Sequence, residues 1–144
     1  MNLIHIDNKM KSISRFVVID DDPVNNALCK MVIKMAVGKI DIKTFTLPEK
    51  GFEYIETEYS KNGNESTSVI LLDLNMPLMS GWEFLERFDS LDEIIKKQLE
   101  IYILSSSVDP RDKARAGANK NVADYIVKPL TKEIILEISE EGRG

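Results

Sequence analysis

Carboxylate, hydroxyl and ammonium side chains follow four short apolar segments of this chain. Residues 16–19 precede Asp20, Asp21 and Asp22, residues 69–72 precede Asp73, residues 101–104 precede Ser105, and residues 125–127 precede Lys128. Carboxylates a few ångströms apart resist joint ionisation, so a cluster of them is costly unless a cation neutralises it. A hard cation with oxygen ligands, Mg²⁺ above all, removes that cost. These residue types therefore suit a divalent metal and a phosphoryl group.

The segments that bear these residues alternate with helical patterns. We expect strands at residues 15–20, 40–46, 69–73, 99–105 and 124–127, and helices that open at Asp22, Pro48, Ser80, Asp109 and Thr131. Five strand–helix units in series imply a parallel sheet with helices on both faces. Ligands of such sheets bind beyond the carboxyl ends of the strands, so the polar groups should converge there.

Apolar residues in the first helix recur with the i, i+3, i+4, i+7 spacing of an amphipathic helix. They are Val24, Ala27, Leu28, Met31, Val32, Met35 and Ala36, and Gly38 is the expected stop. We expect this stripe to face the core. The helix that opens at Asp109 has only small residues at 116–118, which indicates weak anchoring.

Composition excludes several classes of protein. The chain has 144 residues, 43% of them hydrophobic and 30% charged, as in an ordinary single-domain globular protein. A net charge of −5 offers no bulk attraction for nucleic acid or an anionic membrane. The single cysteine, Cys29, and the single histidine, His5, exclude an internal disulfide and a Cys/His zinc site. Without an apolar run of about 18 residues, we expect a cytoplasmic protein.

Four motifs, in this order, resemble the receiver domain of two-component response regulators. They are VVIDDDP at residues 17–23, LLDLNMP at 71–77 with Gly81, ILSSS at 103–107, and DYIVKP at 124–129. The resemblance covers residues 15–142, which leaves residues 1–14 as a short lead-in and no output domain. It implies a doubly wound, flavodoxin-like (βα)5 fold: a five-stranded parallel sheet of order 2-1-3-4-5 with helices on both faces.

The resemblance also implies a role for each acidic residue. Asp73 would be the phospho-acceptor. Mg²⁺ would be held by Asp20, Asp21 and Asp73 and by the backbone carbonyl of Asn75. A carboxylate can accept a phosphoryl group as an aspartyl phosphate, and the transfer needs mainly positioning and charge neutralisation.

The remaining implied residues respond to the phosphoryl group. Ser105 would hydrogen-bond it, Lys128 would form an ion pair with it, and Tyr125 would be an aromatic rotamer switch. The peptide bond from Lys128 to Pro129 would be cis. The donor would be a histidine kinase or a histidine phosphotransfer protein. A downstream protein would read the surface of the fourth helix, fifth strand and fifth helix. The chain would catalyse only its own phosphorylation and slow dephosphorylation, so it would not be a conventional enzyme.

Two other functions stay open at this point. Residues 20–22 satisfy the Asp-x-Asp pattern of Mg²⁺-dependent phosphatases, although the following Pro23 and the lack of a cap-sized insertion argue against that class. A receiver that binds partners without taking up phosphate is the second alternative, and the full acid, serine and lysine set argues against it. Locally, Ser106 or Ser107 could make the contact assigned to Ser105, and Tyr125 could be a packing residue.

Overall fold

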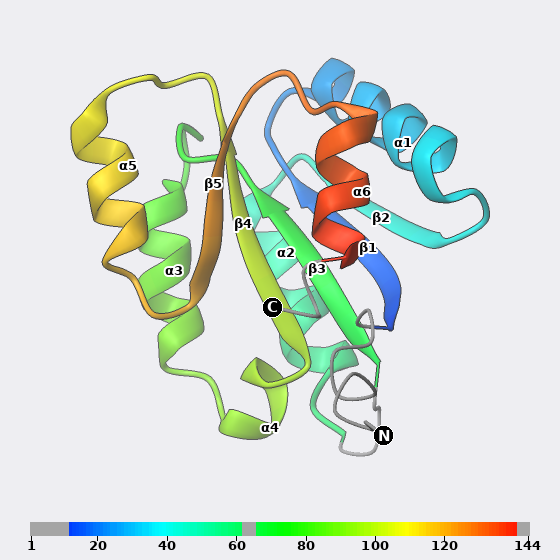
Figure 1. Ribbon diagram of the computed structural model, residues 1–144. Helices are drawn as coiled ribbons and strands as arrows, with labels where there is room; N and C mark the ends of the chain where they lie inside the picture. Colours follow the sequence, from blue (N-terminus) through cyan, green and yellow to red (C-terminus); the bar gives the residue numbers. More distant parts are fainter. Residues whose placement is uncertain (1–11, 62–65, 141–144) are drawn as a thin grey trace, which may run out of the picture.

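A computed structural model describes residues 12–61 and 66–140, and these ranges hold five strands and six helices, with two helices after the third strand and one after each other strand (Figure 1). The elements are β1 (Ile13–Ile19), α1 (Pro23–Val37), β2 (Asp41–Phe45), α2 (Pro48–Glu58), β3 (Thr67–Leu72), α3 (Gly81–Asp89), α4 (Glu93–Lys96), β4 (Leu99–Ser105), α5 (Pro110–Gly117), β5 (Val122–Val127) and α6 (Lys132–Glu140). Most of the predicted lead-in, residues 62–65 and residues 141–144 lie outside the described residues.

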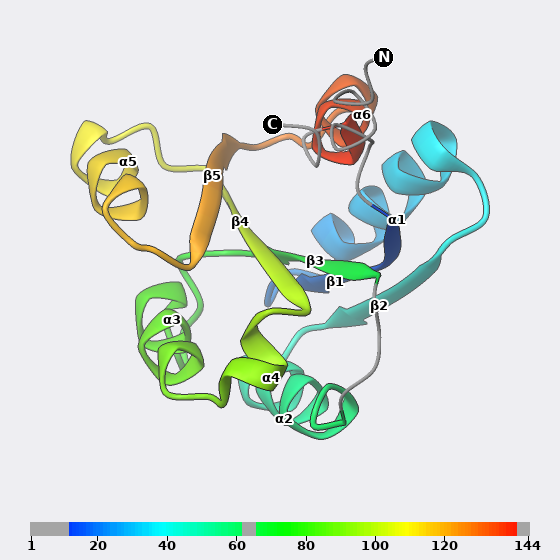
Figure 2. The ribbon, with the colours of Figure 1, turned by 60° about the horizontal axis from the view of Figure 1, so that its bottom comes forward.

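The five strands form one parallel sheet of order β2-β1-β3-β4-β5, which confirms the predicted fold class. The inner strands β1, β3 and β4 are runs of branched apolar residues because a parallel sheet is covered on both faces. Helices α1 and α6 cover one face, and α2, α3 and α4 cover the other (Figure 2). All carboxyl ends of the strands lie at the top in Figure 1.

The helix starts follow local sequence signals. Asp22 caps α1 by accepting a hydrogen bond from the Val24 N–H at 2.9 Å. Ser80 and Glu83 form a reciprocal capping box at the start of α3, where the sequence predicted a helix to open. Asp109 caps α5. Each cap satisfies a backbone N–H that has no partner within its own helix, so these positions are readable from the sequence.

The buried face of α1 differs from the prediction. Its buried residues are Asn26, Cys29 and Ile33. Much of the predicted stripe is exposed instead, at fractions from 48% to 66%, in Val24, Leu28, Met31 and Met35. Apolar residues surround much of this helix, so periodicity alone left its orientation ambiguous. The Asn26 amide decides it by donating to the carbonyls of Asp20 at 3.0 Å and Phe45 at 3.3 Å. These bonds turn a polar residue inward.

Three further details refine the predicted elements. The connection between α3 and β4 includes the short helix α4, which buries Ile95. Strand β1 begins at Ile13, because that residue pairs with Thr67 of β3. Helix α5 buries only Ala116 among its own residues, which confirms its weak apolar anchoring. No helix in the described ranges has the length and apolar character needed to cross a bilayer.

Candidate functional site

Asp20, Asp21 and Asp73 come together beyond the carboxyl ends of β1 and β3. One carboxylate oxygen from each residue lies within 4.8 Å of the other two. The two strands are parallel neighbours with Ile19 opposite Leu72, so the residues that follow them reach the same height. Asp20 and Asp73 are buried, at 2% and 6% exposure. The convergence expected from the sheet topology is therefore present.

Backbone contacts hold the Asp73 turn closely against the sheet and α3. The Asp73 N–H donates to the Ile19 carbonyl at 3.0 Å, and the Gly81 N–H donates to the Leu74 carbonyl at 2.8 Å. A Cβ atom on Gly81 would lie 2.6 Å from the Asp73 carbonyl oxygen. Only glycine permits this approach, which explains why Gly81 accompanies the LLDLNMP motif.

Lys128 brings a positive charge to the acids from the end of β5. Its Nζ lies 2.7 Å from Asp20 Oδ2 and 3.6 Å from Asp73 Oδ1. The Lys128 N–H donates to the Ser105 carbonyl at 2.8 Å. The peptide bond from Lys128 to Pro129 is cis, as the resemblance implied. The lysine is thus near both buried carboxylates, with its shorter contact to Asp20.

Burial and like charge perturb the titration of this cluster. Burial, followed by the charge of Asp20, raises the pKa of Asp73 from 3.8 to about 6, although Lys128 opposes the shift. Burial alone would lower the pKa of Lys128, but the hydrogen bond from Lys128 to Asp20 and the charges of both carboxylates raise it above its usual value. One ammonium therefore does not fully offset the carboxylates.

The donor set fits a hard cation such as Mg²⁺. Asp20, Asp21 and Asp73 offer oxygen atoms only, which are the ligands that Mg²⁺ prefers. Partial exposure of Asp21 leaves the cluster open to solvent on one side. That opening suits Mg²⁺, which keeps several water ligands. Asn75 is exposed in the turn after Asp73, and its backbone forms a hydrogen bond that lowers the pKa of Asp73.

The serines at the end of β4 differ in their surroundings. Ser105 is completely buried, and its Oγ accepts a hydrogen bond from the Ser107 N–H at 3.1 Å. The Ser107 hydroxyl donates to Asp112 Oδ2 at 2.7 Å and accepts from the Asp109 N–H at 3.2 Å. Ser107 is thus engaged with the start of α5, which leaves Ser105 as the better candidate for a phosphoryl contact.

Tyr125 of β5 is half-buried and directed toward the same loop. Its hydroxyl donates to the Ser107 carbonyl at 2.9 Å, and its ring packs against the core on the α2 and α3 side of the sheet. The hydrogen bond joins β5 to the segment between Ser105 and α5. The predicted role of Tyr125 as a switch stays a prediction.

Asn25 is a residue of this site that sequence reasoning passed over. Its Nδ2 donates to Asp20 Oδ2 at 2.8 Å and lies 3.6 Å from Cys29 Sγ. Asn25 lies in the first turn of α1, whose cap follows the acids directly. That position was the available signal, because a side chain there can reach back to the end of β1.

Comparison with known proteins identifies the family of this arrangement. The response regulator receiver domain family matches residues 16–140. The nitrate/nitrite response regulator protein NarL of Escherichia coli is 31% identical over 121 residues, 83% of this chain and 50% of that protein. The cell cycle response regulator CtrA of Brucella ovis is 30% identical over 122 residues, 85% of this chain and 47% of that protein. The chain thus spans half or less of these curated relatives.

Solved structures agree with the sequence comparison. A two-component response regulator from Cytophaga hutchinsonii superposes with a TM-score of 0.81 at 30% identity, covering 92% of this chain and 98% of that one. A CheY-like receiver domain from Methanospirillum hungatei has a TM-score of 0.67 at 21% identity, with 92% and 94% coverage, and supports the fold alone. With the acid cluster, the lysine and the sheet order already in place, these matches make the chain a member of the response regulator receiver domain family.

Proposed function

We propose that this receiver takes a phosphoryl group from a phosphohistidine partner onto Asp73, in a Mg²⁺-dependent reaction. The observation that carries the proposal is the gathering of Asp20, Asp21 and Asp73 within 4.8 Å, beside the Lys128 ammonium. Phosphoryl transfer needs an in-line nucleophile and compensation of the charge on the phosphoryl oxygens. Asp73 offers the nucleophile, and the other residues offer the compensation.

Each residue has a distinct part in this proposal. Asp20, Asp21, Asp73 and the Asn75 backbone carbonyl would hold Mg²⁺, which would supply positive charge to offset the carboxylates and the incoming phosphoryl group. An oxygen of Asp73 forms the new bond to phosphorus while the phosphorus–nitrogen bond of the donor breaks, and the donor imidazole keeps the bonding electron pair. Lys128 pairs with another phosphoryl oxygen, and this requires its ammonium to move from Asp20.

The transfer would be signalled through the loop that follows β4. Ser105 would donate its hydroxyl hydrogen to the new phosphoryl group, and movement of its Oγ toward that group would displace the Ser107 N–H that now donates to it. Because Tyr125 is hydrogen-bonded to the Ser107 carbonyl, a shift of this loop moves the tyrosine as well. Helix α5 has little apolar anchoring, so the α5, β5 and α6 surface can change for a downstream protein.

Partners and cellular location follow from the same proposal. The phosphoryl donor would be a histidine kinase or a histidine phosphotransfer protein, and the output a protein contact, without nucleic acid or membrane binding by this domain. Its action would be in the cytoplasm, where such donors present their phosphohistidine. The domain would catalyse only its own phosphorylation and slow dephosphorylation.

Intact mass measurement after incubation with acetyl phosphate and Mg²⁺ tests the proposal. We expect one phosphoryl adduct on the wild-type protein and none on Asp73→Asn, because the amide cannot act as the acceptor. Omission of Mg²⁺ should also prevent the adduct. Asp89→Asn is the matched control, since this carboxylate lies at the other end of α3, and it should be phosphorylated normally.

Two results would contradict the proposal. An adduct that survives in Asp73→Asn would place the acceptor elsewhere. Absence of an adduct on the wild-type protein would support a binding module that takes up no phosphate, provided that acetyl phosphate is not consumed. Rapid consumption of the donor, with turnover of a phosphomonoester, would instead identify a phosphatase with an aspartate nucleophile.

A further inference from the structure

The Asp20 carboxylate is held by three donors from three parts of the chain. Its Oδ1 accepts from the Asp22 N–H at 2.9 Å. Its Oδ2 accepts from Asn25 Nδ2 at 2.8 Å and from Lys128 Nζ at 2.7 Å. A buried carboxylate with this many donors has a defined plane and a defined direction for any lone pair left to a cation.

Of the three donors, Lys128 is the one that phosphorylation would remove. Its ammonium is already only 3.6 Å from Asp73 Oδ1, and the proposed function requires it to pair with the phosphoryl group. If Lys128 were the sole donor to Asp20 Oδ2, its departure would leave a buried carboxylate oxygen without a hydrogen bond, which is costly. Asn25 keeps its place on Oδ2 in that state, because it approaches from α1 and takes no part in the transfer.

The orientation of the Asn25 amide is determined by its two neighbours. Because the Asp20 carboxylate can only accept hydrogen bonds, the amide nitrogen must face it. The same nitrogen lies 3.6 Å from the buried Cys29 Sγ, a weak acceptor one helical turn further along α1. The Asn25 amide nitrogen thus donates to both the Asp20 carboxylate and the Cys29 sulfur.

We propose that Asn25 is a positioning residue: it fixes the Asp20 carboxylate for the cation and frees Lys128 to serve the phosphoryl group. This inference rests on the proposed function. Hydrogen bonds to the ligands of a metal orient them, and loss of one such partner typically weakens metal binding by about 10–100-fold. Asp20 has a second donor in the Asp22 N–H, so the lower end of that range applies here.

Calorimetric titration of the full chain with Mg²⁺, without a phosphodonor, tests this role. We expect Asn25→Ala to bind Mg²⁺ about tenfold more weakly than wild type. Asn25→Gln, which keeps the amide donor on a longer stem, should recover part of that loss. The thermal midpoint of unfolding without metal, measured in parallel, should change little, because Asn25 is only half-buried.

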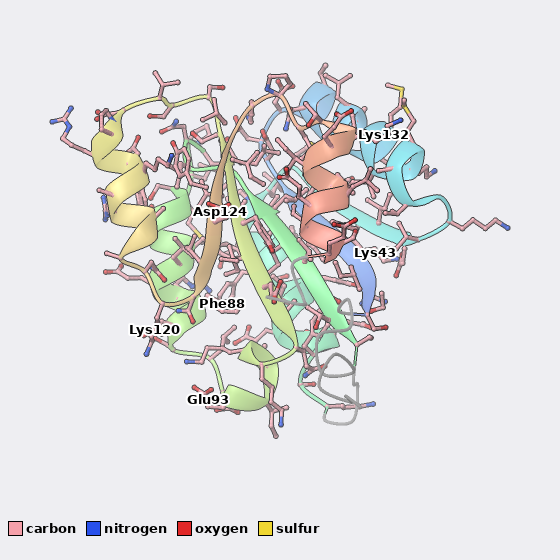
Figure 3. The ribbon with its side chains drawn as sticks, viewed as in Figure 1. Lys43, Phe88, Glu93, Lys120, Asp124 and Lys132 are labelled. Atoms are coloured by element: carbon pink, nitrogen blue, oxygen red, sulfur yellow. The ribbon has the colours of Figure 1, made fainter. Side chains whose placement is uncertain are left out.

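Asn121→Ala is a matched control, because it removes the same kind of bond elsewhere. The Asn121 amide donates to Asp89 Oδ1 at 3.0 Å. Figure 3 labels the chain neighbours of this pair, Phe88 and Lys120, at the end of α3 opposite the acid cluster. Mg²⁺ affinity of this variant should stay within about twofold of wild type.

Two outcomes would overturn the inference. Mg²⁺ affinity of Asn25→Ala equal to that of wild type would show that Asp20 needs no help from Asn25. An equal loss in Asn25→Gln and Asn25→Ala would assign the effect to shape and not to the donor. In both cases wild type still binds Mg²⁺ and the proposed function stands. A wild-type protein that does not bind Mg²⁺ would overturn the proposed function as well.

Discussion

At the carboxyl end of the sheet three aspartates lie together and Lys128 contacts two of them, whereas at the amino end Arg15 meets two acids and a hydroxyl. The Arg15 guanidinium contacts Asp41 at 2.6 Å, Glu58 at 3.3 Å and the Tyr59 hydroxyl at 3.2 Å. Like charges dominate one end and complementary groups the other. Both ends combine buried and exposed polar groups, so the difference lies in how well their charges are matched.

The amino-end network continues into the core through Tyr59. Its hydroxyl donates to Ser68 Oγ at 2.6 Å, and its backbone carbonyl accepts from Gln98 Nε2 at 2.9 Å. These bonds tie the end of α2 to the start of β3 and to Gln98, the residue that precedes β4. A network with its partners in place stabilises the fold, while an acid cluster without a cation stores repulsion that a ligand can relieve. Polar residues at the amino end of the sheet therefore support the structure, and those at the carboxyl end are suited to chemistry.

Loss of Tyr59 gives the largest effect that the comparison predicts. Tyr59 is 2% exposed, and its ring packs edge-on against Tyr54 at 6.4 Å between centroids. Tyr59→Ala should lower the free energy of unfolding by about 3–5 kcal/mol, as for other large buried aromatic residues. Urea denaturation would measure this. If the folded variant loses affinity for Mg²⁺ as well, the two ends of the sheet are not independent.

Removal of the Asp73 charge should raise the free energy of unfolding, whereas loss of Tyr59 lowers it. The pKa of Asp73 rises from 3.8 to about 6 on folding, so the native state binds more protons than the unfolded state between these values. Stability without metal is therefore lost as pH rises from about 4 to 6. At about pH 7, Asp73→Asn should be more stable than wild type by about 1–2 kcal/mol, after allowance for solvent screening.

The pH dependence gives the control for this prediction. At pH values well below 3.8 the Asp73 carboxyl is protonated in both states, so the advantage of Asp73→Asn should vanish. Urea denaturation at several pH values, without metal, would follow it. Saturating Mg²⁺ at neutral pH should stabilise wild type more than the variant. A variant less stable than wild type at neutral pH without metal would show that Lys128 already balances the acids.

Ser68→Ala is expected to have the smallest of these effects. The change removes the acceptor of the Tyr59 O–H, so this buried donor loses its partner, while the Tyr59 oxygen still accepts from Arg15. A loss of about 1 kcal/mol follows, the usual net worth of one buried hydrogen bond. Thermal unfolding would detect it, and phosphorylation with acetyl phosphate should be unchanged. A loss as large as that of Tyr59→Ala would mean that the network acts as one cooperative unit.

Much of the fold and of the candidate site was predictable because its signals are local. Apolar runs of β-branched residues indicate the inner strands, and Asp22, Ser80 and Asp109 cap helices through bonds within a few residues. Short apolar runs that precede Asp20, Asp73 and Ser105 place these residues at strand ends. In a parallel sheet, strand ends meet at one edge. The inward face of α1 was not predictable, because it depends on contacts of Asn26 with two separate strands.

The sequence by itself determined which residues could form the site and that parallel strands would gather them. Only the tertiary structure decided how they are paired. Lys128 lies 108 positions from Asp20 in the chain, yet its Nζ is closer to Asp20 than to Asp73. The tertiary structure also decided that Asn25 donates to Asp20 Oδ2 and that the pKa of Asp73 is raised. Both depend on burial and on the distances between charged groups from separate segments of the chain. These distances are fixed only when the strands have assembled into the sheet.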